Sequence, residues 1–451
     1  MDPRRPGACR PGPVRRHHRA RLPDVVDGPD DDLGDDAHRG PVDGGQLWRR
    51  EGAVPRAGAR GLAGPRRDRV AHPRPRRGRV PADLAHHGRA RRRGQAGLRG
   101  GRGLLPGRVM DAAVPGLDVA RFTTWFAGAR RDLAGDLGGA VSASGVAGGK
   151  SNLTYELVAG ARRWVVRRAP LGHVLATAHD MAREYRVMTA LAETAVPVPR
   201  TVALCEDPDV TGAVTYVMEH VAGTPYRNAA QLAPLGPGRV HGIAEGLVDT
   251  LVDLHRVDPG AVGLADFGRP DGFLERQVRR WRTQMDGSLR REMPAAGTLH
   301  QMLLDRLPSS TGPGRIVHDD YRLDNVLVDA EDRPAAVIDW EMATLGDPLT
   351  DLAMLVIYCR IAGGDAVADA ANAPGFLAED EILDRYATRA GTALAGFGFY
   401  LGLAAFKLAA ILEGIHVRFQ QGQTVGAGFE GVGAVTAPLL DLGISSTKEL
   451  D

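Results

Sequence analysis

Cysteine is scarce in this chain of 451 residues, which has three, and aromatic residues make up 5% of it. Cys9, Cys205 and Cys359 are far apart, which excludes a disulfide scaffold or a cysteine zinc site and favours a reducing compartment. The chain does not open with a basic segment followed by an apolar run, so we expect no secretory signal and a cytoplasmic location. Its 43% hydrophobic content can form a core, and its length suits two lobes or domains.

Lysine is almost absent, with three in the whole chain, and arginine is unevenly distributed. Residues 1–110 hold 26 arginines and no lysine against 12 acidic residues, so their formal charge is about +14. Because the whole chain carries +2, residues 111–451 carry about −12. The chain therefore joins two segments of different composition, and the junction lies near Met110.

Residues 1–110 show no apolar period of 3.6 or 2.0 residues, so we predict neither helix nor strand there. Three interpretations are open: translation from a misassigned start or shifted reading frame of GC-rich DNA, a disordered tail, or a basic arm that binds nucleic acid. The acidic run Asp30–Asp32 and the lack of lysine argue against the arm. We favour the first interpretation and expect no nucleic acid partner.

Residues 111–222 combine helical patterns with short strands, ahead of mostly helical residues 223–451. This order predicts a small sheet with one long helix, followed by a helical region, which is an α+β fold. The predicted elements are helices over 119–137 and 177–192, a glycine- and serine-rich turn over 142–152, and strands over 153–158, 164–167, 202–205 and 214–218.

The predicted turn contains Gly148, Gly149, Lys150, Ser151 and Asn152. A P-loop would need glycine at position 144, where serine stands, and a helix after Ser151, where a strand pattern follows. A glycine loop that covers nucleotide phosphates between two strands fits the pattern better. A plain hairpin turn fits it as well, so the loop alone does not decide between them.

Within residues 223–451, helices are predicted over 238–255 and 273–286, with further helix between 298 and 307. The run 394–412 is long and apolar enough to span a membrane, but Lys407 interrupts it, so we predict a buried helix and no membrane partner. Its aromatic residues suit either a partly apolar acceptor pocket or ordinary core packing. They are Phe397, Phe399, Tyr400 and Phe406.

The residues that suit chemistry best lie in the segment 316–328, where a polar loop separates two apolar runs. Phosphoryl transfer needs a carboxylate that accepts the proton of the attacking hydroxyl, and hard oxygen ligands for magnesium. Asp320 fits the first role. Asn325, together with Asp339 at the end of the next predicted strand, fits the second.

Two neighbours of Asp320 complete the predicted catalytic group. Arg322 is placed to reach the transferring phosphate, and His318 to orient the loop through hydrogen bonds. A turn that is merely rich in Asp and Asn is the alternative interpretation. The strand and Asp339 at the expected distance, behind a glycine loop and a helical Glu184, favour the catalytic one.

These motifs resemble the aminoglycoside phosphotransferase/choline-kinase-like family, and above all its branch associated with acyl-CoA dehydrogenases. The resemblance covers residues 140–420. The matching segments are Gly148–Tyr155, Val165–Arg168, His179–Tyr185, Tyr216–Glu219, His318–Asn325, Ile338–Glu341 and Gly346–Leu352.

The resemblance implies a protein-kinase-like fold with two lobes, residues 111–222 with a small antiparallel sheet and residues 223–451 with the catalytic loop. It also implies that ATP lies in the cleft, with its adenine against the backbone around Glu219 to Val221. Glu184 is then expected to pair with Arg167, and Mg²⁺ to bind Asn325 and Asp339.

Two residues depart from the family's usual motif. Asp319 stands where the family usually has glycine, so it either adds a negative charge beside the base or points to solvent. Arg167 stands where kinases usually have lysine, and an arginine keeps the charge but differs in shape and hydrogen bonding. Asp347, directly before Pro348, is expected to cap a helix, with a direct role at the metal or substrate as the alternative.

The resemblance therefore implies a kinase that transfers the γ-phosphate of ATP, with Mg²⁺, to a hydroxyl group of a small molecule. We favour a hydroxyacyl or CoA-type metabolite as the acceptor. The alternatives are an aminoglycoside or amino-alcohol kinase, and a catalytically weak nucleotide-binding scaffold, for which Asp319 and Arg167 are the motivation.

Overall fold

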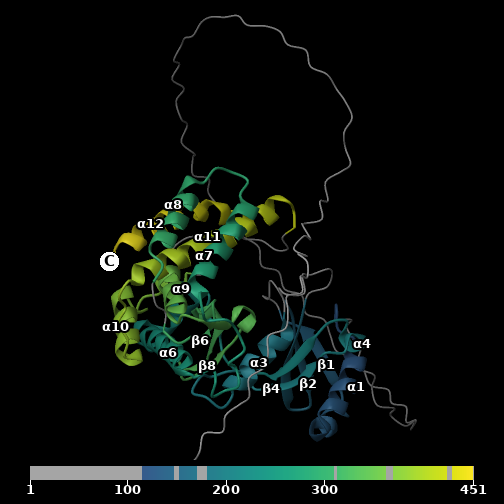
Figure 1. Cartoon of the computed structure of the whole chain (residues 1–451). Helices are drawn as coiled ribbons and strands as arrows, with labels where there is room; N and C mark the ends of the chain where they lie inside the picture. The colour runs from purple at the N-terminus through teal and green to yellow at the C-terminus, as the bar shows by residue number, and fades with distance from the viewer. Residues whose placement is uncertain are drawn as a thin grey trace, which may run out of the picture. The chain divides into compact units, whose positions relative to one another are not determined.

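The computed structural model describes residues 114–146, 152–169, 180–308, 312–361, 369–423 and 429–449 (Figure 1). Predictions for residues 1–110, and for Gly148, Gly149, Lys150 and Ser151, lie outside the described residues. The described part combines a five-stranded antiparallel sheet with a mainly helical remainder, which confirms the predicted α+β class.

The strands of the first lobe form one sheet in the order β1-β2-β3-β5-β4. Tyr155 and Leu157 of β2 face the core while their neighbours are partly exposed, as the period of two requires. A left-handed Gly160 makes the turn between β2 and β3. The strands are β1 (Val141–Gly145), β2 (Leu153–Ala159), β3 (Arg162–Arg168), β4 (Thr201–Cys205) and β5 (Thr215–Glu219).

The turn predicted over 142–152 starts too early. Residues 142–145 belong to β1 and pair with residues 155–158 of β2. β1 consists of small residues and serines, which carry little strand propensity, so only the pairing with β2 reveals it.

The helix predicted over 119–137 is interrupted at Arg130, whose backbone leaves the helical region with φ −126° and ψ 73°. The Arg130 guanidinium donates to the Asp132 carboxylate and to the Val202 carbonyl of β4, so the break is fixed against the sheet. The two resulting helices are α1 (Val119–Ala129) and α2 (Ala134–Leu137).

The helix predicted over 177–192 is α3 (Met181–Leu191), which the Asp180 carboxylate caps by accepting the Arg183 N–H. Its apolar side chains, among them Val187 and Leu191, join the core of the second lobe, whereas α1 packs its Phe122 on the sheet. α3 therefore carries residues of the first lobe to the boundary with the second.

The second lobe is mainly helical, as predicted, and includes two small sheets. Strand β6 (Arg315–Val317) pairs with β9 (Thr344–Gly346), and β7 (Val326–Val328) pairs with β8 (Pro334–Val337). The helices are α5 (Ala229–Leu232), α6 (Pro237–Arg256), α7 (Phe273–Ser288), α8 (Pro294–Asp305), α9 (Leu349–Arg360), α10 (Glu379–Ala390), α11 (Phe397–Gln420) and α12 (Val432–Glu449); a further short helix, α4 (Pro208–Thr211), lies in the first lobe.

Helix α11 contains the long apolar run and packs against α7, α9 and α12 (Figure 1). It is the one helix in the described ranges that is long and apolar enough to cross a membrane, and 89% of that stretch is buried inside the protein. The four aromatic residues singled out in the sequence are all buried, so core packing accounts for Phe397, Phe399 and Phe406. The side chain of Tyr400 also lines a small cavity beside Lys407.

The chain passes from β5 to the second lobe through a short extended segment. The Glu219 N–H donates to the Arg200 carbonyl at 2.8 Å. Further on, Thr224 and Val328 exchange backbone hydrogen bonds of 2.8 and 3.1 Å, which joins this segment to β7. Gly223 makes the approach possible, because a Cβ there would lie 2.9 Å from that of Leu327.

Candidate active site

The catalytic segment leaves β6 at Val317 and returns into β7 at Val326, so its polar residues lie between two strands of different sheets. His318 is fully buried. Its Nε2 lies 3.0 Å from the Ile338 carbonyl, and its Nδ1 accepts the Asp320 N–H at 3.3 Å. The imidazole thus joins the backbone before Asp339 to the backbone of Asp320, which is the orienting arrangement expected for His318.

Asp351, on α9, fixes the start of this loop. Its two carboxylate oxygens accept the N–H groups of His318 and Asp319, each at 2.7 Å, and His255 Nε2 lies 3.3 Å away. Burial alone would raise the pKa of Asp351, but the hydrogen bond from His255 and its positive potential lower it below the usual range. The fully buried carboxylate therefore stays ionised and holds the loop.

Of the two alternatives for Asp319, the one in which its side chain points to solvent is wrong. Its carboxylate is buried and lies 2.6 Å from Lys407 Nζ. Burial raises the pKa of Asp319, and Lys407 opposes that rise. Asp319 also has φ of 65°, a left-handed conformation that glycine adopts most easily, which explains why a family with this loop usually has glycine there.

Asp320 faces Asn325, as the spacing of the motif requires. Asn325 Nδ2 donates to the Asp320 carboxylate at 3.0 Å and to its backbone carbonyl at 2.9 Å. With its nitrogen used in this way, the Asn325 side chain has its amide oxygen left as the atom able to bind a cation. Asn325 also accepts the Ile338 N–H through its backbone, so Asp339 is tied to the same loop.

Asp339 stands just after β8 with φ of 70°. The strand ends at Val337, two residues earlier than predicted. Asp319 and Asp339 are two of the three non-glycine residues with positive φ in the described part of the chain. Such conformations are costly and concentrate at functional sites.

Arg167, on β3, forms the centre of a charged cluster between the two lobes. Its guanidinium lies 2.9 Å from Asp339 and 3.2 Å from Glu184 of α3, the pairing expected for Glu184. Burial would lower the pKa of Arg167, but Tyr216 and the two carboxylates raise it, so the guanidinium stays charged. Burial raises the pKa of Glu184, although Arg167 and the Tyr216 hydroxyl, at 2.8 Å, favour its charged form.

Asn152, directly after the glycine loop, is buried in the same cluster. Its amide nitrogen donates to Glu341 at 2.9 Å and to Glu184 at 3.3 Å. We name Asn152, Arg167, Glu184, Tyr216 and Asp339 the nucleotide-side cluster. Two of its buried polar atoms, Asn152 Oδ1 and Arg167 Nε, lack a hydrogen-bond partner within the described residues. Buried polar atoms of this kind are satisfied by a ligand or by water.

The donors present fit a magnesium nucleotide. Mg²⁺ typically takes one or two carboxylate or amide oxygens from the protein, with substrate phosphates and water completing the shell. Asp339, whose side chain is 32% exposed, and Asn325 carry such oxygens. Across the described ranges, no group of three or more His, Cys, Asp or Glu side chains has a metal-binding arrangement, so phosphates would have to complete the shell.

Arg322 lies beside Asp320, and its side chain contacts Asp324 and Tyr358. Its Nε lies 3.5 Å from Asp320 and 3.1 Å from Asp324, and its guanidinium carbon lies 5.0 Å above the Tyr358 ring. Burial, and more weakly the carboxylate of Asp320, raises the pKa of Tyr358, so this hydroxyl remains protonated.

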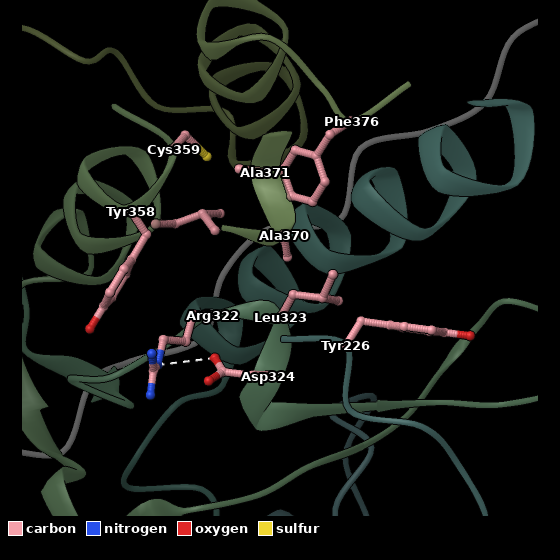
Figure 2. A pocket seen from close by; sticks show the side chains of 10 residues that line it. Tyr226, Arg322, Leu323, Asp324, Tyr358, Cys359, Ala370, Ala371 and Phe376 are labelled. Atoms are coloured by element: carbon pink, nitrogen blue, oxygen red, sulfur yellow. Dashed lines mark ion pairs between the residues drawn. The ribbon is translucent and has the colours of Figure 1, made fainter. Parts of the chain in front are cut away.

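A pocket with about 340 Å³ of space, partly open to solvent, lies beside Arg322 (Figure 2). Figure 2 shows the Arg322–Asp324 ion pair at one side, with Leu323 next to it, and the ring of Phe376 at the opposite side. We name it the acceptor-side pocket. Its lining residues are Tyr226, Arg322, Leu323, Asp324, Leu355, Tyr358, Cys359, Ala370, Ala371 and Phe376.

Tyr358 was missed in the sequence, whereas Asp351 lies in the segment Gly346–Leu352 that carries the resemblance. Tyr358 and Asp351 are both on α9, whose turn of helix brings them beside a loop more than 30 residues earlier. Asp347 accepts the Leu349 N–H at 3.0 Å, which is the capping role expected, and it also accepts the Tyr400 hydroxyl at 2.8 Å. The hinge assignment of Glu219 and Val221 stays a prediction.

Comparison with known proteins gives a consistent result. The profile of the phosphotransferase enzyme family matches residues 142–391, more than half of the chain. Acyl-CoA dehydrogenase family member 11 of Gallus gallus is 32% identical over 321 residues, which cover 69% of this chain and 41% of that protein. Acyl-CoA dehydrogenase family member 10 of Mus musculus is 34% identical over 310 residues, 67% of this chain and 29% of that protein.

The chain thus spans about two fifths, or less, of the length of these curated relatives. Among solved structures, a candidate aminoglycoside phosphotransferase of Ralstonia eutropha is 32% identical, with a TM-score of 0.64. The alignment covers 74% of this chain and 99% of that one. These matches confirm the expected kinase-like fold and the resemblance to the branch associated with acyl-CoA dehydrogenases.

Proposed function

The chain belongs to the phosphotransferase enzyme family, and we propose that it is a cytoplasmic, ATP- and Mg²⁺-dependent kinase of a partly apolar small molecule that carries a hydroxyl group. The observation that carries the proposal is the convergence of Asp320, Asn325 and Asp339. Asn325 contacts Asp320 through its side chain and the backbone before Asp339 through its carbonyl. Phosphoryl transfer needs a base and two cation ligands in that relation.

In this proposal, each residue of the site has a separate role in the transfer. Bound Mg²⁺-ATP supplies the γ-phosphoryl group and neutralises part of its charge. Asp320 accepts the proton of the acceptor hydroxyl, and Asn325 keeps its carboxylate in place. Arg167 holds phosphate oxygens on the nucleotide side, while Asn325 and Asp339 hold the magnesium ion. Glu184 keeps Arg167 extended toward the phosphates.

The acceptor-side pocket supports an acceptor with an apolar portion. Its walls include Leu355, Phe376 and Ala370, and its polar edge is the Arg322–Asp324 pair next to Asp320. A hydroxyl bound at that edge would lie beside the base, with the rest of the molecule against the apolar wall. The names of the curated relatives favour a hydroxyacyl or CoA-type metabolite over an aminoglycoside or amino alcohol.

The two departures that motivated a non-catalytic scaffold are compatible with catalysis. Arg167 makes the expected pair with Glu184 and, in addition, an ion pair with Asp339. Asp319 is neutralised by Lys407, so its carboxylate does not compete with Asp320 for a cation in the cleft. The scaffold alternative is decided by experiment.

The test is a screen for a mass gain of one phosphate in the presence of ATP and Mg²⁺. Hydroxyacyl-CoA thioesters, free hydroxy acids, amino alcohols and aminoglycosides are the four acceptor groups, and Asp320→Ala is the control variant. We expect product from the first two groups and a loss of about 10³-fold in turnover for the variant. ATP binding without phosphorylation of any acceptor, unchanged in Asp320→Ala, would instead establish the scaffold.

A further inference from the structure

Lys407 lies behind the catalytic loop, on α11, and no part of the proposed reaction uses it. Its ammonium group contacts Asp319 Oδ1 at 2.6 Å and also donates to the Asp319 backbone carbonyl. The side chains of Lys407 and Asp319 are only 5% and 6% exposed. One of three lysines in the chain is therefore buried against the residue that precedes the proposed base.

The contacts around Asp319 fix both of its backbone dihedrals. Its N–H donates to Asp351 at 2.7 Å, which holds the peptide before it. Its carbonyl accepts from Lys407, while the N–H of the same peptide, that of Asp320, donates to His318 at 3.3 Å. The peptide planes on either side of Asp319 are therefore held, and a left-handed φ of 65° persists in a residue other than glycine.

Stability alone does not account for this pair. A buried ion pair gains little net free energy, because the cost of removing two charges from water offsets their attraction. Glycine at position 319 would adopt the same backbone without a buried charge. The aspartate adds what glycine lacks, a carboxylate that holds the Lys407 ammonium group in place, so that this group also donates to the carbonyl of the Asp319–Asp320 peptide and ties that peptide to α11.

The surroundings of the pair are consistent with a fixed ammonium group. Trp281 of α7 has its ring 5.5 Å from Lys407 Nζ, and the Arg280 and Asp351 charges also act on Asp319. Asp319 and Lys407 line a small cavity together with Gln277, Trp281, Thr350, Met354, Tyr400, Leu403 and Ala404. Among the described residues that line this cavity, Asp319 is the one carboxylate, and it is the acidic partner of Lys407 there.

We propose that Lys407 is a positioning residue, which sets the Asp320 carboxylate through its contacts with Asp319. This inference rests on the proposed role of Asp320 as the base. Loss of the contact releases the Asp319–Asp320 peptide, and the Asp320 carboxylate then moves from its contact with Asn325. A misplacement of about 1 Å is enough to lower turnover about 100-fold. Nucleotide affinity should change little, because Arg167, on β3, keeps its contacts with Glu184 and Asp339.

The experiment uses the full chain and three variants at these positions. Lys407→Met removes the contact and Lys407→Arg keeps the charge. The double variant Asp319→Asn with Lys407→Met removes the contact and leaves neither position charged. The double variant covers the case in which Lys407→Met does not fold. Glu413→Gln is the matched control, because it breaks another ion pair of α11, with Arg291, away from the loop.

Three measurements are made on each variant: the crystal structure, the affinity for Mg²⁺-AMP-PNP, and turnover of ATP with water or the best acceptor. We expect Lys407→Met and the double variant to bind AMP-PNP within about threefold of the parent chain while kcat falls about 100-fold. For Lys407→Arg, kcat should be within about tenfold of that of the parent chain. For Glu413→Gln, neither kcat nor the affinity for AMP-PNP should change. In the crystal, the 3.0 Å contact between Asn325 and Asp320 should be lost in the two methionine variants.

A folded Lys407→Met or double variant that keeps the Asn325–Asp320 contact and full turnover overturns the inference. If the parent chain itself turns over no ATP, the proposed function fails instead, and the crystal structures alone decide about Lys407. An unmoved Asp320 carboxylate then overturns the inference, and a displaced one supports it.

Discussion

The nucleotide-side cluster and the acceptor-side pocket flank the same catalytic loop but differ in composition. In the cluster, Arg167 is shared by Glu184 and Asp339, so every charge depends on another. Among the described residues that line the pocket, the charged ones are Arg322 and Asp324 at one edge, and the other walls are mainly apolar, with two tyrosines and Cys359. Removing one member of a coupled set of buried charges costs much stability, because its partner is left buried and unpaired. Apolar walls are instead sensitive to changes in side-chain volume.

This difference also separates side chains that cannot be changed without breaking an ion pair from side chains that can be changed in size. Under the proposed function, the cluster contacts ATP, which all members of a kinase family share, and the pocket contacts the acceptor, which differs between members. Apolar walls can be reshaped without breaking an ion pair. Substitutions on the two sides should therefore change different kinetic constants.

The largest effect is expected for Arg167→Met. The substitution leaves the fully buried Glu184 without its cation, so we expect a loss of about 3 kcal/mol in stability and at least about 100-fold in affinity for Mg²⁺-AMP-PNP. Urea unfolding measures the stability, and titration calorimetry measures the affinity for Mg²⁺-AMP-PNP. Arg163→Met is the matched control, since Arg163 lies on the same strand but pairs with Glu156 at the surface. Equal losses in both variants would contradict the special role of the cluster.

A substitution beneath the shared loop should affect both sides at once. Asp351→Asn removes one of the charge-assisted acceptors of the His318 and Asp319 N–H groups, and we expect a cost of about 2–3 kcal/mol at pH 7. The pKa of Asp351 is lower in the folded chain, so its contribution is present above the unfolded pKa of about 3.9 and is lost as the pH falls further.

Urea unfolding at pH 7 and at pH 3 tests the Asp351 prediction. The gap in stability between the parent chain and Asp351→Asn should narrow at the lower pH. Glu275→Gln, which breaks an exposed pair with Arg279, should cost less than about 0.5 kcal/mol at either pH. A gap that widens in acid would mean that the pKa of Asp351 is raised in the folded chain, contrary to its contacts.

These contacts show what a sequence can and cannot reveal. The spacing of His318, Asp320 and Asn325 follows from one local loop, so the motif is sufficient to predict their grouping. Asp351 and Lys407 act on that loop from helices 32 and 88 residues away from Asp319. A buried aspartate in an apolar helix, and a lysine inside an apolar run, were the available signals, but neither signal identifies its partner without the packing of the helices.

Local signals were also ambiguous for the sheet. β1 carries no apolar alternation, so it is formed by pairing with β2 and not by its own propensity. The break at Arg130 depends on a carbonyl of β4, which lies 72 residues later. Tertiary contacts decide both features, whereas β2, β3 and α3 follow their own periodicity and were predicted within a few residues.

On the acceptor side, a change in volume should act without affecting ATP. Ala371→Phe places a ring in the pocket of Figure 2, and we expect KM for the acceptor to rise about tenfold with KM for ATP unchanged. Ala378→Phe, at the exposed start of α10, is the matched control and should change neither constant. Steady-state kinetics with each substrate varied in turn give the answer. A rise in KM for ATP alone would mean that the pocket binds the nucleotide and not the acceptor, contrary to the prediction.

The smallest effect is expected at Cys359, whose thiol lines the acceptor-side pocket. Burial raises the pKa of Cys359 to about 12, so roughly one thiol in ten thousand is ionised at pH 8. Alkylation by iodoacetamide should therefore be slow and should speed up about tenfold per pH unit between 8 and 10. Because the thiol plays no part in transfer, Cys359→Ser should change kcat and KM less than about twofold.

Bound acceptor should slow alkylation of Cys359 but not of Cys205, which is buried in β4 outside the pocket. Peptide mass spectrometry measures both rates in one sample. Equal protection of the two cysteines would show that acceptor binding changes the whole chain, and the separation between the two sides of the site would then not hold.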